Sequence, residues 1–105
     1  MTYRYVIDAY AWIEYFTASK SGEVAKAYIE SGDAATPTIV VAEVSRKLQK
    51  EIALKNETPD GRLKRLEFIR ATSQIVDLDF EVAAEAGKTA VDLKKKREIG
   101  AWQMQ

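Results

Sequence analysis

Residues Tyr5–Phe16 read YVIDAYAWIEYF and contain a change from a strand pattern to a helix pattern, from which the fold class follows. The segment Tyr3–Ile7 is short and rich in β-branched and aromatic residues, which predicts a strand. From Ala9 to Thr17 the large apolar residues recur at helical spacing, which predicts a helix. A single residue, Asp8, separates the two, so the chain passes directly from a strand into a helix.

The same alternation of strand and helix continues along the chain. Ser21-Gly22 is expected to break the first helical stretch and Ser31-Gly32 to close the second, while Pro37 opens the third, since proline suits a helix's first turn. Strands separated by helices of this length imply a single α/β domain with a parallel sheet and right-handed crossovers. The predicted strands are Tyr3–Ile7, Ala34–Thr36 and Gln74–Leu78, and the predicted helices are Ala9–Thr17, Glu23–Glu30, Thr38–Ala53, Gly61–Ala71 and Phe80 to about Ile99. Thr58-Pro59-Asp60 is interpreted as a cap followed by proline at the first helical position, leading into Gly61–Ala71.

The composition restricts the chemistry. The 105 residues include 16 basic and 16 acidic side chains, no histidine and no cysteine. The lack of histidine excludes Ser-His-Asp and Cys-His catalysis and His-ligated zinc. The lack of cysteine excludes disulfides and thiolate metal sites, and a cytoplasmic location is expected. No apolar run suits a membrane span and no signal peptide is apparent, so no membrane partner is expected. Because the formal net charge is zero, nucleic-acid binding would have to come from local patches.

Two acidic residues are candidates for a functional site. Asp8 follows the first strand, and in open α/β sheets ligands bind at the carboxyl ends of the strands. The same position suits an N-cap of the following helix. Glu43 follows the apolar run Pro37–Ala42, and a carboxylate among buried residues requires a partner or a metal. Alternatively, Glu43 is exposed and pairs with Lys47 in the i,i+4 arrangement.

Taken together, Asp8 and Glu43 suggest a metal centre. Hard oxygen ligands grouped at a sheet edge suit Mg²⁺ or Mn²⁺, which bind through a few carboxylates and retain several waters. Such a centre can hydrolyse phosphodiesters by activating a metal-bound water. Two carboxylates are few for this purpose, and residues alone leave a phosphatase or a DNA nuclease open as alternatives.

These residues also carry a resemblance to a known family. The segments Tyr5–Phe16 and Thr36–Leu48, the latter TPTIVVAEVSRKL, resemble the PIN-domain family and, within it, the archaeal VapC-type toxins of toxin–antitoxin pairs. The family's first aspartate matches Asp8, and the glutamate of its AEL motif matches Glu43 in AEV. The segment Leu78–Leu93 also follows the family's pattern. The resemblance implies a PIN-like parallel sheet flanked by helices and a Mg²⁺- or Mn²⁺-dependent endoribonuclease. Asp8 and Glu43 would be its catalytic and metal-binding residues, RNA its substrate and a cognate antitoxin its partner.

The chain departs from the family's pattern at two places. Tyr10 stands where the family often has Ser or Thr, which helps to position the metal-bound water. The family's third acid lies after the last predicted helix, in a motif like Gly-Leu-Ala-Asp-Ala, whereas this sequence has no acid after Glu98. Asp77, Asp79 and Asp92 match no catalytic position, and we interpret them as a strand-end residue, a cap and a solvated helix residue.

The last residues suggest a reason for the missing acid. The codons of Trp102–Gln105, read two nucleotides later and extended back to Gly100, can encode Gly-Leu-Ala-Asp-Ala. This favours a frameshift near the adenine-rich Lys94–Lys96 codons and a domain that lacks the family's C-terminal helix and strand. Uncovered sheet edge and apolar surface would then favour a homodimer or higher oligomer.

Two functions remain open at this point. The first is the ribonuclease, impaired by the missing acid, with Arg46 as a candidate to meet phosphate, although a solvated cation is the favoured interpretation of that residue. The second is a catalytically inactive module that binds an antitoxin or associates with itself. The aromatic residues of the first helix could stack bases, but their helical spacing favours a place in the core.

Overall fold

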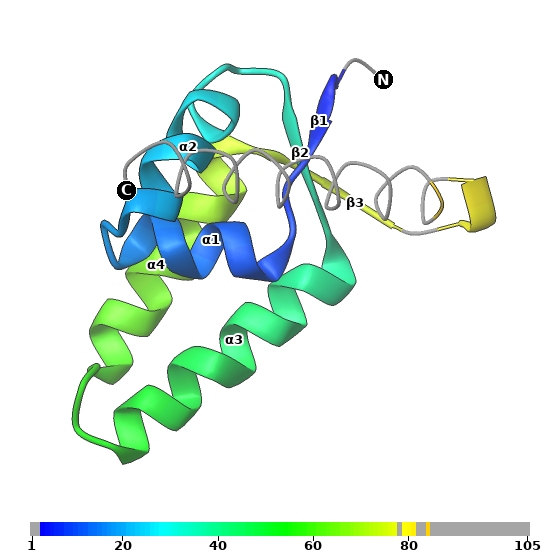
Figure 1. Cartoon of the computed structure of the whole chain (residues 1–105). Helices are drawn as coiled ribbons and strands as arrows, with labels where there is room; N and C mark the ends of the chain where they lie inside the picture. Colours follow the sequence, from blue (N-terminus) through cyan, green and yellow to red (C-terminus); the bar gives the residue numbers. More distant parts are fainter. Residues whose placement is uncertain (1–2, 78, 82–83, 85–105) are drawn as a thin grey trace.

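The computed structural model describes residues 3–77, 79–81 and 84 (Figure 1). Over these residues the chain alternates between strands and helices, as its pattern predicts. The elements are β1 (Tyr5–Val6), α1 (Ala9–Phe16), α2 (Lys20–Ile29), β2 (Ala34–Pro37), α3 (Thr38–Ala53), α4 (Pro59–Thr72) and β3 (Gln74–Val76).

The three strands form one parallel sheet in the order β1-β2-β3. Tyr5 pairs with Ala34 in β2, and Thr36 of β2 pairs with Ile75 in β3. Because all the strands run the same way, their carboxyl ends meet at one edge of the sheet. Both α1 and α3 begin at this edge (Figure 1). The predicted parallel α/β sheet flanked by helices is thus confirmed.

The core lies where the four helices pack with the sheet, and α2 contributes Ala25 and Ile29 to it. α3 buries Val40, Val44 and Leu48, which lie on one face because they are four residues apart. α1 contributes Trp12, which is fully buried and stacks on Phe16 with ring centroids 5.6 Å apart. α4 contributes Ile69, its one buried residue. No helix in the described ranges is long and apolar enough to cross a membrane.

The prediction that Ser21-Gly22 breaks the helix is wrong. Ser19 caps α2, because its Oγ accepts a hydrogen bond from the Gly22 N–H at 3.0 Å, and the helix already begins at Lys20. Gly22 is buried in the first turns of α2 against the end of α1. A Cβ at this position would lie 2.2 Å from the carbonyl oxygen of Glu14, so the glycine permits the close approach of the two helices.

Other boundaries agree closely with the sequence pattern. α3 spans the predicted residues Thr38–Ala53, and Pro37 is its N-cap as the last residue of β2. Thr58 caps α4 as predicted, with Oγ1 accepting from the Gly61 N–H at 3.0 Å, and Pro59 is the first helical residue, also as predicted. The predicted end of the third strand at Leu78, and nearly all of the predicted helix from Phe80 to about Ile99, lie outside the described residues.

Candidate metal centre

Asp8 follows β1 at the carboxyl edge of the sheet and caps α1. Its Oδ1 accepts a hydrogen bond from the Ala11 N–H at 2.8 Å, with the Asp8 backbone extended at φ −87° and ψ 170°. The predicted capping role is therefore confirmed. Within the described ranges Oδ2 has no hydrogen-bond or ion-pair partner, and the side chain is only half-buried. Capping and metal binding are compatible, since each uses a different oxygen.

Glu43 lies in the second turn of α3 and is exposed, so the exposed alternative is confirmed and a place among buried residues is excluded. The apolar run before it looks continuous in sequence, yet Ile39 and Ala42 are exposed as well. The predicted pairing with Lys47 is wrong, because Lys47 pairs with Glu51 at 3.7 Å. Among the residues that the structure covers, Glu43 makes no hydrogen bond or ion pair.

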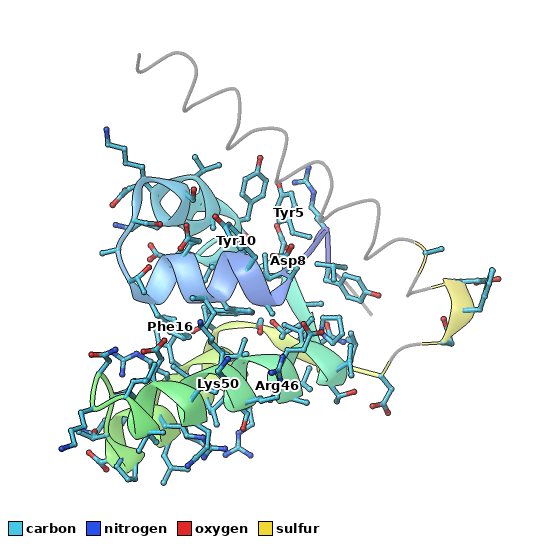
Figure 2. All side chains as sticks on the ribbon, turned by 60° about the horizontal axis from the view of Figure 1, so that its bottom comes forward. Tyr5, Asp8, Tyr10, Phe16, Arg46 and Lys50 are labelled. Carbon is cyan, nitrogen blue, oxygen red and sulfur yellow. The ribbon has the colours of Figure 1, made fainter. Side chains whose placement is uncertain are left out.

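The two acids lie near the starts of two neighbouring helices. Lys47 and Glu51 line a depression together with Ile13 of α1, so this side of α3 faces α1. Glu43 is one helical turn before Lys47 and lies on the same side, closer to the carboxyl edge of the sheet. Asp8 stands at that edge, at the beginning of α1 (Figure 2). The metal-binding role of both residues stays a prediction.

No further acid joins them in the part of the chain that the structure describes, where no three His, Cys, Asp or Glu side chains are grouped to hold a metal. Asp77 follows β3 and is exposed, with the Thr38 hydroxyl 3.5 Å from its Oδ1, which agrees with its interpretation as a strand-end residue. β2 lies between β1 and β3, so the backbones at Asp8 and Asp77 are about 10 Å apart, two strand spacings. Asp92 lies outside the described residues.

Two tyrosines of α1 donate hydrogen bonds to glutamates. Tyr10, at the position where the resemblance leads us to expect Ser or Thr, is exposed and directs its hydroxyl to Glu14 Oε1 at 3.1 Å, one turn further along the helix. Tyr15 donates to Glu30 Oε2 at 2.7 Å. Burial, and then the hydrogen bond and charge of Glu30, raise the pKa of Tyr15 to about 12.

Three aromatic residues of α1, Trp12, Tyr15 and Phe16, belong to the packing, whereas Tyr10 is exposed. Trp12 is fully buried, and Tyr15 stacks on Phe68 of α4 with ring centroids 5.8 Å apart. The core interpretation of Trp12 is therefore confirmed. Sequence reasoning missed the contribution of α4, because nothing in the spacing shows which face of α4 meets α1.

Sequence reasoning also missed a cluster of cations between α3 and α4. Arg46 and Lys50 of α3 and Arg62 of α4 line one depression. The i,i+4 spacing of Arg46 and Lys50 was the available signal, whereas the approach of Arg62 depends on the packing of the two helices.

Comparisons with known proteins assign the chain to a family. A family model described as the PIN domain matches residues 5–102, which include Asp8 and Glu43. Comparison with curated proteins found no match, and comparison with solved structures found none either.

Proposed function

The chain belongs to the PIN-domain family, and on that premise we propose that it is a Mg²⁺- or Mn²⁺-dependent endoribonuclease of the VapC type. PIN domains are nuclease-like and typically use divalent metals, which supports the coarse assignment. One observation on this chain supports the proposal. Asp8 and Glu43 stand near the starts of α1 and α3, and no other described residue engages Oδ2 of Asp8 or either carboxylate oxygen of Glu43.

The donor set suits a hard cation. Asp8 and Glu43 offer carboxylate oxygens alone, and Mg²⁺ accepts one or two carboxylates while water fills its other positions. The hydrogen bond from Ala11 fixes one oxygen of Asp8 and so orients the other. A bound cation would lower the pKa of a water and neutralise charge on the phosphodiester. The residues of this chain would hold the cation and orient the scissile phosphate beside α1 and α3.

A second function is favoured by the small number of acids. No third acid joins Asp8 and Glu43 over the residues described, and a metal nuclease with too few ligands should cleave poorly. The chain would then be an inactive module that binds a cognate antitoxin or a second copy of itself. Exposed apolar side chains, Ile39 of α3 and Leu63 of α4 among them, support such association. A cytoplasmic location belongs to both versions of the proposal.

An RNA-cleavage assay with and without Mn²⁺ separates the two functions. We expect metal-dependent cleavage that Asp8→Asn and Glu43→Gln each reduce by at least about 100-fold, the scale of losing one electrostatic group of a catalytic centre. Glu23→Gln, on the exposed side of α2, is the matched control and should leave the rate unchanged. Cleavage that survives both site variants would indicate a contaminant and remove the support for this centre.

Absence of cleavage by the unmodified chain would favour the inactive module. Light scattering then tests self-association, for which a homodimer or higher oligomer is the expected result. A monomer across the concentration range would contradict that part of the proposal.

A further inference from the structure

The depression between α3 and α4 carries an unusual set of side chains. Three are cations, two are neutral hydrogen-bonding residues, two are alanines, and none is acidic. Figure 2 shows Arg46 and Lys50 along α3. The full lining is Ala42, Ser45, Arg46, Gln49, Lys50, Ala53 and Arg62.

The charges in this depression are not compensated, in contrast to those in the depression between α1 and α3. There, Lys47 pairs with Glu51 at 3.7 Å, and Arg65 Nη1 lies 2.6 Å from Glu57 Oε2. Over the described ranges neither Arg46 nor Lys50 makes an ion pair or a hydrogen bond. The α3–α4 depression is therefore a local positive patch on a chain whose formal net charge is zero.

Arg62 is fixed in place without being neutralised. Its Nε donates to the Ser45 carbonyl oxygen at 3.4 Å, and its Nη2 donates to the Ser45 hydroxyl. Both acceptors are uncharged, so the guanidinium keeps its full charge and has donors left over. A cation held this way loses less conformational freedom when it binds an anion.

Simple solvation explains this cluster less well than it explains a single lysine. Arg46 and Lys50 are i,i+4 neighbours of like charge, which costs a few tenths of a kcal/mol on a helix. Lys50 gains from its place in the last turn of α3, but Arg46 lies mid-helix and has no such compensation. Arg62 comes from a different helix and still converges on the same depression.

We propose that this depression binds the phosphodiester backbone of single-stranded RNA next to the bond that the Asp8–Glu43 centre cleaves, an inference that rests on the proposed function. The two regions are continuous along α3. Arg46 is three residues after Glu43 and therefore its neighbour on the helix surface, and Lys50 lies about 10 Å along the axis from Glu43. Arginine guanidinium groups match phosphate oxygens in a bidentate manner, and lysine adds a point charge.

The test measures RNA binding in the presence of a chelator, so that cleavage does not enter. Fluorescence anisotropy of a labelled, mixed-sequence oligoribonucleotide gives the affinity at a series of salt concentrations. The unmodified chain is compared with the double variant Arg46→Gln/Lys50→Gln. The matched control is Lys20→Gln/Lys26→Gln, which removes the same charge from exposed positions of α2.

We expect the Arg46→Gln/Lys50→Gln variant to bind more weakly, with the slope of log K against log salt reduced by about 1.4, which corresponds to two lost phosphate contacts on a single strand. The control should keep the original slope. Equal losses in both variants would show that net charge alone matters and would overturn the proposal, as would an unchanged slope in both. Competition by polyglutamate at an affinity equal to that of RNA would assign the depression to acidic peptides and overturn it as well.

The outcome is separable from that of the nuclease assay. Asp8→Asn and Glu43→Gln should retain the salt-dependent binding while losing cleavage. If the chain binds RNA through Arg46 and Lys50 but never cleaves it, the proposal of RNA binding in the α3–α4 depression would be supported and the nuclease proposal would be contradicted. If the chain cleaves RNA but the slope of log K against log salt is unchanged by Arg46→Gln/Lys50→Gln, the nuclease proposal would be supported and the proposal of RNA binding in the α3–α4 depression would be overturned.

Discussion

Trp12 donates its indole N–H to the Thr36 hydroxyl at 3.0 Å, at a point where both residues are fully buried. The Thr36 hydroxyl lies 2.7 Å from that of Ser73, which donates to the Ile69 carbonyl oxygen at 2.8 Å. Since each hydroxyl has one proton, Thr36 must donate to Ser73. This chain of bonds joins α1, β2 and the end of α4, and it leaves none of these polar groups unsatisfied.

Replacing Thr36 with valine should therefore destabilise the fold although the two side chains have nearly the same shape. The Trp12 N–H and the Ser73 hydroxyl each lose a buried partner, for which we expect a cost of about 1–3 kcal/mol. Chemical denaturation of the Thr36→Val variant measures this directly. Thr38→Val is the control, since Thr38 is exposed and the change should stay within about 0.5 kcal/mol. Equal stability of the two variants would mean that the buried hydrogen bonds of Thr36 contribute nothing to the free energy of unfolding.

Gly22→Ala should destabilise the contact between α1 and α2. Alanine favours a helix over glycine by about 1 kcal/mol, so propensity alone predicts a gain. The added Cβ would lie 2.2 Å from the Glu14 carbonyl oxygen, a backbone atom that cannot move aside cheaply. We expect a net loss of about 1–3 kcal/mol, typical of overpacking, in denaturant unfolding. The neighbouring Ser21→Ala change tests propensity without the clash, and a Gly22→Ala variant that matched its stability would contradict this account.

Much of the fold could be predicted because its signals are local. The bounds of α3 follow from its apolar spacing and the preceding proline, and the start of α4 from Thr58 and Pro59. The start of α2 could not be predicted in this way. The local pattern indicates that Gly22 breaks a helix, whereas in the structure Gly22 lies inside α2, where a side chain would clash with Glu14 of α1. A contact between two helices cannot be predicted from a local pattern.

The candidate site shows the same division. Asp8 was identifiable because it directly follows a strand, and parallel strands end at one edge. The surroundings of Glu43 could not be predicted from the sequence, because the tertiary packing determines which part of the run Ile39–Ala42 is buried. Arg62 and Arg46 line the same depression because of the way α3 and α4 pack. The spacing of residues in the sequence does not predict this packing.

Asp8 should show separate effects on stability and activity because it has two roles. Asn is as good an N-cap as Asp, so Asp8→Asn should retain stability within a few tenths of a kcal/mol while losing the carboxylate. Asp8→Ala removes the acceptor of the Ala11 N–H and should cost about 1 kcal/mol in addition. Thermal or denaturant unfolding of the two variants checks this. If Asp8→Asn unfolded as readily as Asp8→Ala, the side-chain cap would contribute nothing to stability.

Alkaline stability should depend on the Tyr15–Glu30 pair. Burial and the Glu30 carboxylate raise the pKa of Tyr15 to about 12, whereas an unfolded tyrosine ionises near pH 10. The folded chain thus holds this proton over a range where the unfolded chain has released it. Tyr15 therefore contributes stability that is fully present below about pH 10 and is lost as pH rises through about 12. We expect the unfolding free energy to fall more steeply over this range in the unmodified chain than in Tyr15→Phe. Glu30→Gln should show an intermediate slope, since it keeps an acceptor but removes the charge, whereas parallel curves for all three proteins would show that the pair does not couple to folding.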